Sequence, residues 1–338
     1  MKLSTLFLSS AALVVAGSAY AADLPAKKGA PAAKPAATGC PAFGAGFFQI
    51  PGGDNCIQFS GYMRNTTTNT SGSTTNSAGA RVAFDVRSNS DMGVVRGYLR
   101  TNTTAGGNVT SDRAYAQIAG LTAGAYGAFF DIAGSNGIGF GSGLGGDTGR
   151  GIKYSMALGS ASVTAALQDQ ATGDTTKGNQ DILGSVALPV GPGTIQVNAA
   201  SHSNAVSTGY AVAAVAKLPA GPVNVNVYGG ISSGAIAYTG VAGTASTADS
   251  ASGSVNDGTA VGTSVSMTAG QGTFYVDIGR VTEKLNSTGV TGTATSYSVG
   301  YDYTGVKGIQ IIPEYYHTDD NTLNTSTNTI YLRIQRDF

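Results

Sequence analysis

The sequence predicts an all-β fold, a transmembrane antiparallel β-barrel of about sixteen strands. Three observations predict it: an export signal at the start of the chain, period-two alternation of apolar and polar residues along most of its length, and connections that alternate between short and long. The composition agrees, since 50 of the 338 residues are Gly, 11% are charged and Trp is absent. These values disfavour a core of packed helices.

Residues 1–21 have the organisation of a cleaved signal peptide. Lys2 precedes an apolar run at 6–16, and residues 19–21, Ala-Tyr-Ala, supply the small side chains of a cleavage site. The run is shorter than the roughly 20 residues that a spanning helix needs, so a retained anchor is the weaker alternative. No later segment reaches about 18 consecutive apolar residues. We therefore expect export without membrane helices.

The next two segments precede the first strand. Residues 22–39 are rich in Ala, Pro and Lys without apolar periodicity, which is typical of an extended periplasmic tether; contact of its lysines with an acidic cell-wall polymer is the less favoured alternative. Residues 40–56 are bounded by Cys40 and Cys56, the only cysteines. An oxidising compartment favours a disulfide between them. Zinc binding is the weaker alternative because the two histidines are distant in sequence.

Residues 57–338 form the predicted barrel. Apolar and small polar residues alternate with period two, as in Val223, Val225 and Val227 against Asn224 and Asn226. The expected strands are 57–65, 79–89, 92–102, 111–120, 124–133, 149–158, 160–169, 180–189, 193–202, 208–218, 222–232, 258–269, 271–283, 294–304, 307–318 and 327–338. Fourteen or eighteen strands are the alternatives, the larger number if residues 233–257 contain one more hairpin.

The connections between these strands differ by rim. The short ones are rich in Gly, Pro, Asn or Asp and fall at 88–91, 120–124, 189–193, 219–222, 269–272 and 305–308. The long ones fall between them, at 66–78, 134–148, 233–257 and 319–326. Short periplasmic turns and long external loops are the pattern of an outer-membrane barrel, in which apolar residues face lipid and polar residues face a wet interior. Closure pairs every backbone amide within the protein, as a bilayer requires.

Six of the ten arginines fall within the first four predicted strands. Period-two parity turns them inward, because an Arg facing lipid at mid-depth costs roughly 2 to 4 kcal/mol. The predicted pore-lining residues are Arg64, Arg81, Asp85, Arg87, Arg96, Arg100, Arg113, Asp131 and Asp147. A basic ladder would raise the local anion concentration. The alternative is that these arginines pair with Asp85, Asp131 and carbonyl groups and only stiffen the wall.

Acidic residues later in the chain are candidates for a side of the pore that faces this ladder. Asp131 and Asp147 would contribute to it together with Asp277, Asp302 and Glu314. Opposed walls of opposite charge would produce a transverse field that orients dipolar solutes.

Two segments resemble a known family, the general porins of alphaproteobacteria. Residues 40–64, CPAFGAGFFQIPGGDNCIQFSGYMR, are similar to that family's opening segment, and the chain ends in YLRIQRDF. Its last residue, Phe338, matches the terminal aromatic that the outer-membrane insertion machinery reads as a sorting signal. The resemblance spans the whole mature chain at the level of organisation. It implies a sixteen-stranded, usually homotrimeric barrel whose third external loop folds inward. Residues 134–148 depart from the family in having Asp147 as their only charge.

The function expected from these features is that of an outer-membrane porin, a passive aqueous channel for small hydrophilic solutes and ions. A substrate-selective channel for a sugar or another nutrient is the alternative. An enzyme is disfavoured, because His202 and His317 lie near strand ends as expected of solvated residues and no GxSxG, HExxH or P-loop motif occurs. We expect no cofactor or metal. Basic and acidic residues balance at 19 each, which gives no reason to expect nucleic-acid binding. The expected partners are outer-membrane lipids and the insertion machinery.

Overall fold

The structure, a computed structural model, describes residues 39–145, 148–169, 180–203, 208–239, 256–285, 291–321 and 324–338. All of them belong to one unit, Gly39–Phe338. The predicted signal peptide, 1–21, and residues 22–38 of the predicted tether lie outside the described residues. Gly39, the last residue of that tether, forms an isolated antiparallel bridge with Phe48.

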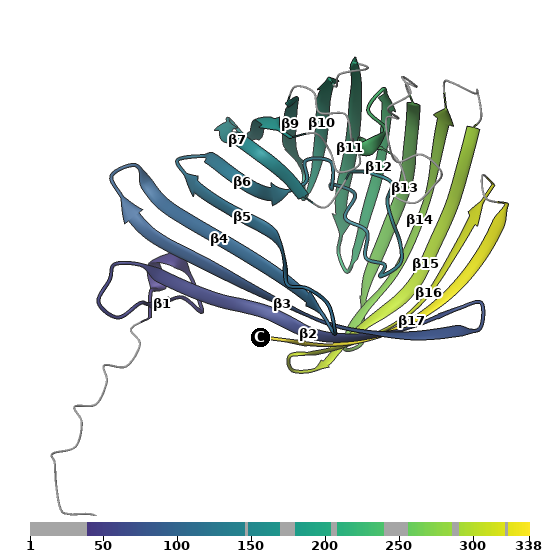
Figure 1. Ribbon diagram of the computed structural model, residues 1–338, viewed down its shortest axis with the longest axis horizontal. Helices are drawn as coiled ribbons and strands as arrows, with labels where there is room; N and C mark the ends of the chain where they lie inside the picture. Colours follow the sequence, from purple (N-terminus) through teal and green to yellow (C-terminus); the bar gives the residue numbers. More distant parts are fainter. Residues whose placement is uncertain are drawn as a thin grey trace, which may run out of the picture. The chain divides into compact units, whose positions relative to one another are not determined.

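The chain forms a closed antiparallel barrel of sixteen strands (Figure 1). Each strand from β2 to β17 pairs with the next, and β17 pairs with β2, which closes the ring. The short β1 adds to the start of β2. The predicted fold and the count of sixteen are confirmed among the described residues, whereas most of 233–257, where a further hairpin was considered, lies outside them. No described helix is long and apolar enough to cross a membrane.

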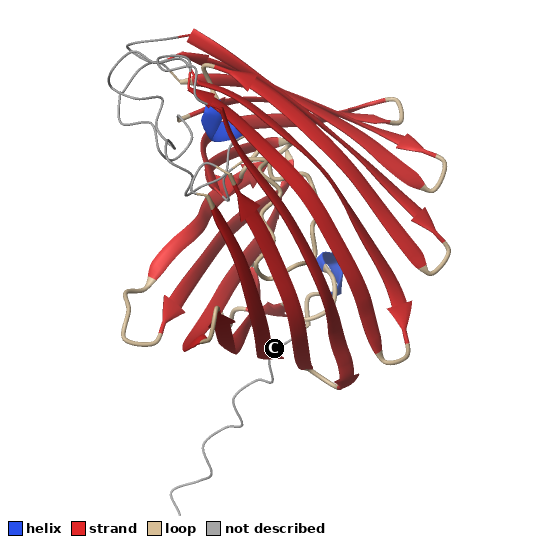
Figure 2. Cartoon of the chain, turned by 90° about the vertical axis from the view of Figure 1, so that its right-hand side faces the viewer, coloured by secondary structure: helices blue, strands red, loops and turns tan. Residues whose placement is uncertain are grey.

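The elements follow one another in a simple up-and-down order (Figure 2). They are η1 (Pro41–Phe43), β1 (Phe48–Gln49), β2 (Cys56–Thr70), β3 (Ser73–Ser90), β4 (Gly93–Thr104), β5 (Thr110–Ile118), β6 (Leu121–Gly127), β7 (Thr148–Leu158), β8 (Ala161–Gln168), β9 (Asp181–Val190), β10 (Gly193–Ser203), β11 (Thr208–Ala220), β12 (Val223–Ser233), η2 (Ile236–Tyr238), β13 (Asn256–Ala269), β14 (Gly272–Leu285), β15 (Thr291–Val306), β16 (Ile309–Asp320) and β17 (Thr325–Asp337).

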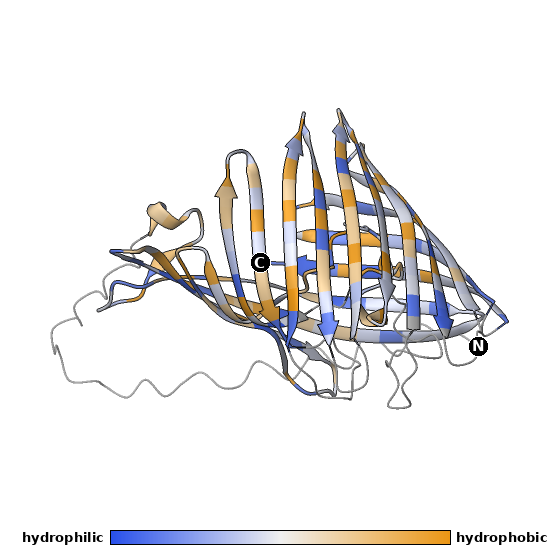
Figure 3. Cartoon of the chain, turned by 90° about the horizontal axis from the view of Figure 1, so that it is seen from above, coloured by the Kyte–Doolittle hydropathy of each residue, from blue (hydrophilic) through white to orange (hydrophobic). Residues whose placement is uncertain are grey.

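The two faces of the sheet differ in polarity, and the apolar residues of each strand share one parity. In β17, Ile330, Leu332 and Ile334 are all exposed on the outer face, while Tyr331 and Arg333 between them are partly buried. Figure 3 shows the resulting bands of apolar and polar residues along the strands. Exposed apolar residues on the outside are what contact with lipid requires.

The turns at one rim are two residues long. They lie at 91–92, 119–120, 159–160, 191–192, 221–222, 270–271 and 307–308. Gly191, Gly221 and Gly270 have positive φ in these turns, the conformation that the tightest hairpins need. The opposite rim has the longer connections, apart from the one between β2 and β3.

The predicted long loop at 66–78 is wrong, because β2 and β3 continue through it to a two-residue turn at Ser71 and Gly72. Polar side chains bond across the hairpin in place of an apolar face. Thr67 Oγ1 lies 2.7 Å from Asn76 Oδ1, and Asn69 Nδ2 lies 2.6 Å from Thr74 Oγ1. Thr has a high strand propensity, so a Thr-rich polar segment can extend a hairpin as well as form a loop.

The predicted strand at 124–133 is wrong beyond Gly127, where β6 ends. Phe130 and Ile132 leave the sheet and are buried in an apolar cluster. Tyr126, which alternates in sequence with the same parity as Phe130 and Ile132, is also buried. The local pattern of a strand is thus overridden by packing inside the barrel.

Candidate functional site

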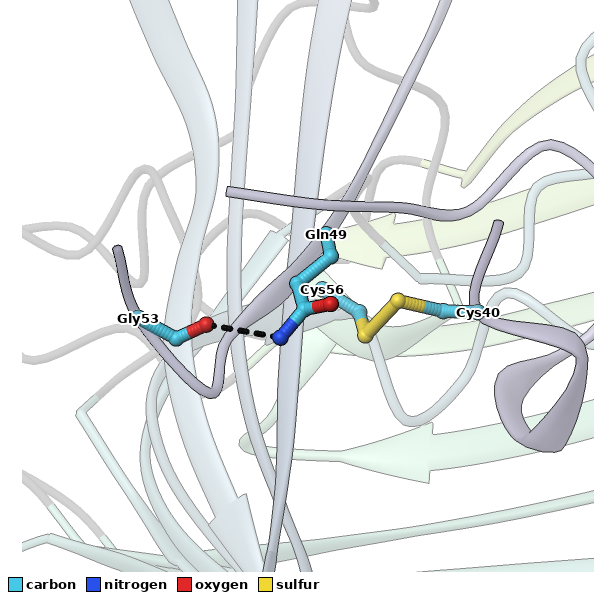
Figure 4. The surroundings of a disulfide bond; sticks show 4 residues. All are labelled: Cys40, Gln49, Gly53 and Cys56. Carbon is cyan, nitrogen blue, oxygen red and sulfur yellow. Dashed lines mark hydrogen bonds between the residues drawn. A yellow bond between two sulfur atoms is a disulfide. The ribbon is translucent and has the colours of Figure 1, made fainter. Parts of the chain in front are cut away.

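The predicted disulfide between Cys40 and Cys56 is confirmed. It joins the segment that precedes β2 to the first residue of that strand, and their Cα atoms are 6.2 Å apart. Gln49 Nε2 donates to the carbonyl oxygen of Gly53 within the segment, at 3.0 Å (Figure 4). The Cys-bounded segment is therefore held compactly at the start of the barrel.

The register of β2–β7 places the predicted arginines in cross-strand rows. Arg87 pairs with Arg96, which pairs with Gln117. Gln117 pairs with Thr122, and Thr122 pairs with Lys153. Directly paired residues lie on the same face of a sheet. We call the polar, inward face of these strands the basic wall; its cations are Arg64, Arg81, Arg87, Arg96, Arg100, Arg113 and Lys153.

Asp85 is shared by two arginines of this wall. Arg87 and Arg96 each donate from Nε to Asp85 Oδ1 at 3.0 Å and from Nη2 to Oδ2 at 2.8 Å. Asp85 is buried, whereas the side chains of both arginines remain partly exposed. One carboxylate thus orients two cations without neutralising both.

Asp112, which was not among the residues predicted from the sequence, orients a second pair of arginines, Arg81 and Arg100. Its carboxylate lies 2.5 Å from Arg100 Nη2 and 3.7 Å from Arg81 Nη2. Simple alternation turns Asp112 away from the face that Arg113 occupies. However, the ladder between β4 and β5 shifts after Arg100, which pairs with Arg113 while Thr101 pairs with Ser111. This β-bulge turns the Asp112 carboxylate toward the arginines, and nothing in the sequence marks its position.

Tyrosine rings hold several of these cations in place. The guanidinium carbon of Arg96 lies 5.0 Å from the Tyr98 ring centroid and 5.5 Å from that of Tyr115, and these two rings are stacked. Arg64 lies 4.7 Å from the ring centroid of Tyr62. Cation–π contacts of this kind restrict the charged groups without neutralising them.

Residues 128–145, which we call the inner loop, lie against the wall opposite the basic wall (Figure 1). The backbone amides of Asn136 and Gly137 donate to the Asp277 carboxylate, at 3.2 and 2.8 Å. Those of Ile138 and Gly139 donate to Glu314, at 2.5 and 2.9 Å. The inward folding that the family resemblance implied for this loop is confirmed. We call Asp277 and Glu314, with the amides that they bind, the loop anchor.

Apolar side chains complete the contact of the inner loop with the barrel. Phe130, Phe140 and Leu144 belong to one buried cluster with small residues of the strands, among them Ala211 and Ala213. The loop thus covers the inner face of β11, which explains why Ala and Val occupy both faces of that strand.

Two residues of the expected acidic side of the pore, Asp277 and Glu314, are covered by the inner loop. Asp277 is 0% exposed and Glu314 is 2% exposed, because the loop lies over them. Both lie on the wall opposite the arginines, but they bind the backbone amides of the loop and are not exposed to the open pore. Asp131 lies in the inner loop and is exposed, while Asp147 lies outside the described residues.

A second buried cluster lies beside the inner loop. His202 Nδ1 contacts both oxygens of Asp181, at 2.9 and 3.0 Å, and the Tyr238 hydroxyl donates to Asp181 Oδ2 at 2.5 Å. Burial and the Asp181 charge raise the pKa of Tyr238, which keeps its hydroxyl protonated. The amide of Gly145 donates to the Tyr238 carbonyl oxygen at 2.9 Å. His202 is thus buried, contrary to the solvated position expected of it.

The remaining predicted residue, Phe338, continues the closing ladder between β17 and β2. Its amide donates to Gly61 at 3.1 Å, and the Gly61 amide donates back at 3.0 Å. The Phe338 side chain is exposed. Among the described residues, no group of three or more His, Cys, Asp or Glu is arranged to hold a metal ion.

Comparison with known proteins identifies a family and a fold. The model of a family described as the porin subfamily matches residues 30–336. No curated protein sequence matches the chain.

Solved structures share the fold at low sequence identity. The outer membrane channel DcaP of Acinetobacter baumannii is 14% identical with a TM-score of 0.71, the match covering 86% of this chain and 99% of that one. The anion-selective porin from Comamonas acidovorans is 13% identical with a TM-score of 0.62, covering 84% of this chain and 100% of that one. A loop-deletion mutant of OmpT, an outer membrane protein of Vibrio cholerae, is 14% identical with a TM-score of 0.66, covering 85% of this chain and 100% of that one.

Proposed function

The chain belongs to the porin family and is a channel protein of the bacterial outer membrane; on this premise we propose that it is a passive aqueous channel that favours small anions. The observation that carries the proposal is the charge of one half of the wall. Strands β2–β5 contain six arginines but only two acidic residues, Asp85 and Asp112. The two carboxylates orient the arginines and leave an excess of positive charge.

The excess charge acts on solutes because the arginine side chains are not fully covered. Those of Arg81, Arg87 and Arg96 retain 29%, 27% and 26% exposure while paired with aspartate. Arginine keeps its charge at any physiological pH, so the preference for anions should not titrate. Like charges that line one side of a narrow aqueous path raise the local anion concentration and oppose cation passage.

The anchored inner loop supports a passive mechanism. The inner loop is held at its centre by Asp277 and Glu314, and its end is bonded to Tyr238. A loop fastened in this way narrows the channel without acting as a gate. A substrate-selective channel for a nutrient is the alternative, which saturable flux of an uncharged nutrient such as a sugar would distinguish.

We also propose how the protein is exported, inserted into the membrane and assembled. The leader at 1–21 would direct export, the tether at 22–39 would remain in the periplasm, and Phe338 would serve the insertion machinery as a sorting signal. A homotrimer in outer-membrane lipid is proposed because one fold relative, OmpT, is described in a trimer form. The paired-cysteine segment at 40–64 supports a place among the alphaproteobacterial porins.

The test is single-channel recording of the purified protein in planar bilayers, with the reversal potential measured under a salt gradient. We expect stepwise ohmic openings and an anion preference that falls in Arg96→Ala/Arg100→Ala. The matched control is Arg280→Ala, because Arg280 is exposed on β14 and shares the parity of the exposed Phe274 and Ile278. Equal selectivity in the parent and in Arg96→Ala/Arg100→Ala would reduce the arginines to a structural role. The absence of openings from folded protein would refute the channel.

A further inference from the structure

A cavity of about 350 Å³ lies in the basic wall, between β4, β5, β6 and β7. It is open on one side and is lined mainly by polar atoms. Its charged and aromatic residues include Arg96, Arg100, Arg113, Lys153, Tyr115 and Tyr126. The volume is within the range of sites that hold small molecules, roughly 300 to 1,000 Å³.

The register concentrates positive charge around this cavity. Arg100 and Arg113 are direct cross-strand partners, an arrangement of like charges that is unfavourable in a sheet. Asp112 offsets part of the repulsion through its contact with Arg100. Lys153 adds a further cation on β7, in the cross-strand row of Arg96. A solute with negative charge would stabilise the whole group.

The cations are already held in position, which favours binding. The ammonium of Lys153 lies 4.6 Å from the ring centroid of Tyr126, and that tyrosine is 1% exposed. Arg96 lies over the stacked rings of Tyr98 and Tyr115. Side chains that are restrained before a ligand arrives lose little conformational entropy when it binds.

The donor set defines the class of ligand. Guanidinium groups present parallel N–H donors that match the oxygen pairs of carboxylate and phosphate. We propose that this cavity is a binding subsite for small organic anions that carry a carboxylate or phosphate group, and that it makes their passage saturable. This subsite rests on the proposed function, because it requires an aqueous channel with a basic wall. Chloride would pass without saturating it, because chloride lacks the paired oxygens that guanidinium groups match.

The test measures inhibition of the chloride current through single channels by added succinate and, separately, by inorganic phosphate. In the parent we expect inhibition that saturates. In Lys153→Ala the half-saturating concentration should rise by about fivefold or more, as loss of one charge-assisted contact implies. Lys153→Arg should restore it, and Arg280→Ala should leave it unchanged.

The outcomes separate the subsite from the channel. Saturation by succinate alone assigns carboxylates, saturation by phosphate alone assigns phosphate groups, and saturation by both supports the shared chemistry. Inhibition that does not saturate, or that is identical in Lys153→Ala, would refute the subsite while leaving the channel and its anion preference intact. A parent that forms no ohmic channels would refute the proposed function itself.

Discussion

The basic wall and the wall beneath the inner loop differ in the exposure of their charged side chains. On the basic wall, Asp85 and Asp112 orient arginines that stay partly exposed. On the other wall, Asp277 and Glu314 are buried and bind the loop's backbone amides. The comparison teaches that a charge inside a barrel acts on solutes only where no loop covers it. The wall beneath the loop includes small inward residues such as Ala211 and Ala213, whereas arginines and tyrosines line the basic wall.

Removing the loop anchor should have the largest effect. Asp277→Ala/Glu314→Ala leaves the amides of Asn136, Gly137, Ile138 and Gly139 without their acceptors, at a cost of about 3 to 5 kcal/mol. We expect the loop to detach and single-channel conductance to rise by about twofold or more.

Planar-bilayer conductance and thermal unfolding would measure these two effects. Asp319→Ala is the matched control, because the Asp319 side chain is 63% exposed. Unchanged conductance in the double variant would show that the anchor does not position the loop, and the contrast between the two walls would fail.

Removing a carboxylate from the basic wall should change ion selectivity strongly and the structure only slightly, in contrast to removal of the loop anchor. Asp85→Asn takes the shared charge from Arg87 and Arg96 and should cost about 2 kcal/mol of stability. The anion preference should increase because two cations lose their counter-charge. Reversal potentials would measure it. An unchanged preference would favour the alternative that these arginines only stiffen the wall.

The second buried cluster offers a smaller perturbation. Tyr238→Phe removes one donor to Asp181 while keeping the ring that lies 4.7 Å from Phe130, centroid to centroid. The loss should be about 1 to 2 kcal/mol of unfolding free energy, because a buried carboxylate loses one hydrogen bond. We expect noisier open-channel current and little change in mean conductance. Tyr210→Phe, at an exposed tyrosine, should match the parent in both calorimetry and current noise.

The disulfide should matter least to the channel. Cys40→Ser/Cys56→Ser opens a link across 16 residues, and the constraint is worth about 3 kcal/mol to the Cys-bounded segment. The ring of sixteen strands closes without that segment. Limited proteolysis should cleave residues 40–55 more rapidly, while conductance and barrel unfolding stay unchanged. A large fall in the barrel's unfolding temperature would show that the segment stabilises the whole fold.

Period-two alternation was sufficient to predict all sixteen strands, because each strand has lipid on one side. Alternation gave the wrong structure for segments whose side chains do not face lipid. Phe130 and Ile132 alternate as in a strand but pack inside the barrel, and the polar hairpin around Ser71 has no apolar face to reveal it.

The arginines of the site were predictable from their number and parity, but their partners were not. Asp112 contacts Arg100 because a β-bulge turns its side chain inward, and no local sequence pattern predicts that bulge. The loop anchor depends on contacts between residues as distant as Gly139 and Glu314, which alternation along single strands does not relate.

The central claim is that the exposed charge of the basic wall sets the channel's selectivity. Charge reversal tests it most directly, through the reversal potential of Arg96→Glu/Arg100→Glu in a potassium chloride gradient, with Arg280→Glu as the control. We predict anion preference in the parent and in Arg280→Glu, and cation preference in Arg96→Glu/Arg100→Glu. A folded, open Arg96→Glu/Arg100→Glu channel that keeps the parent's anion preference would contradict the account.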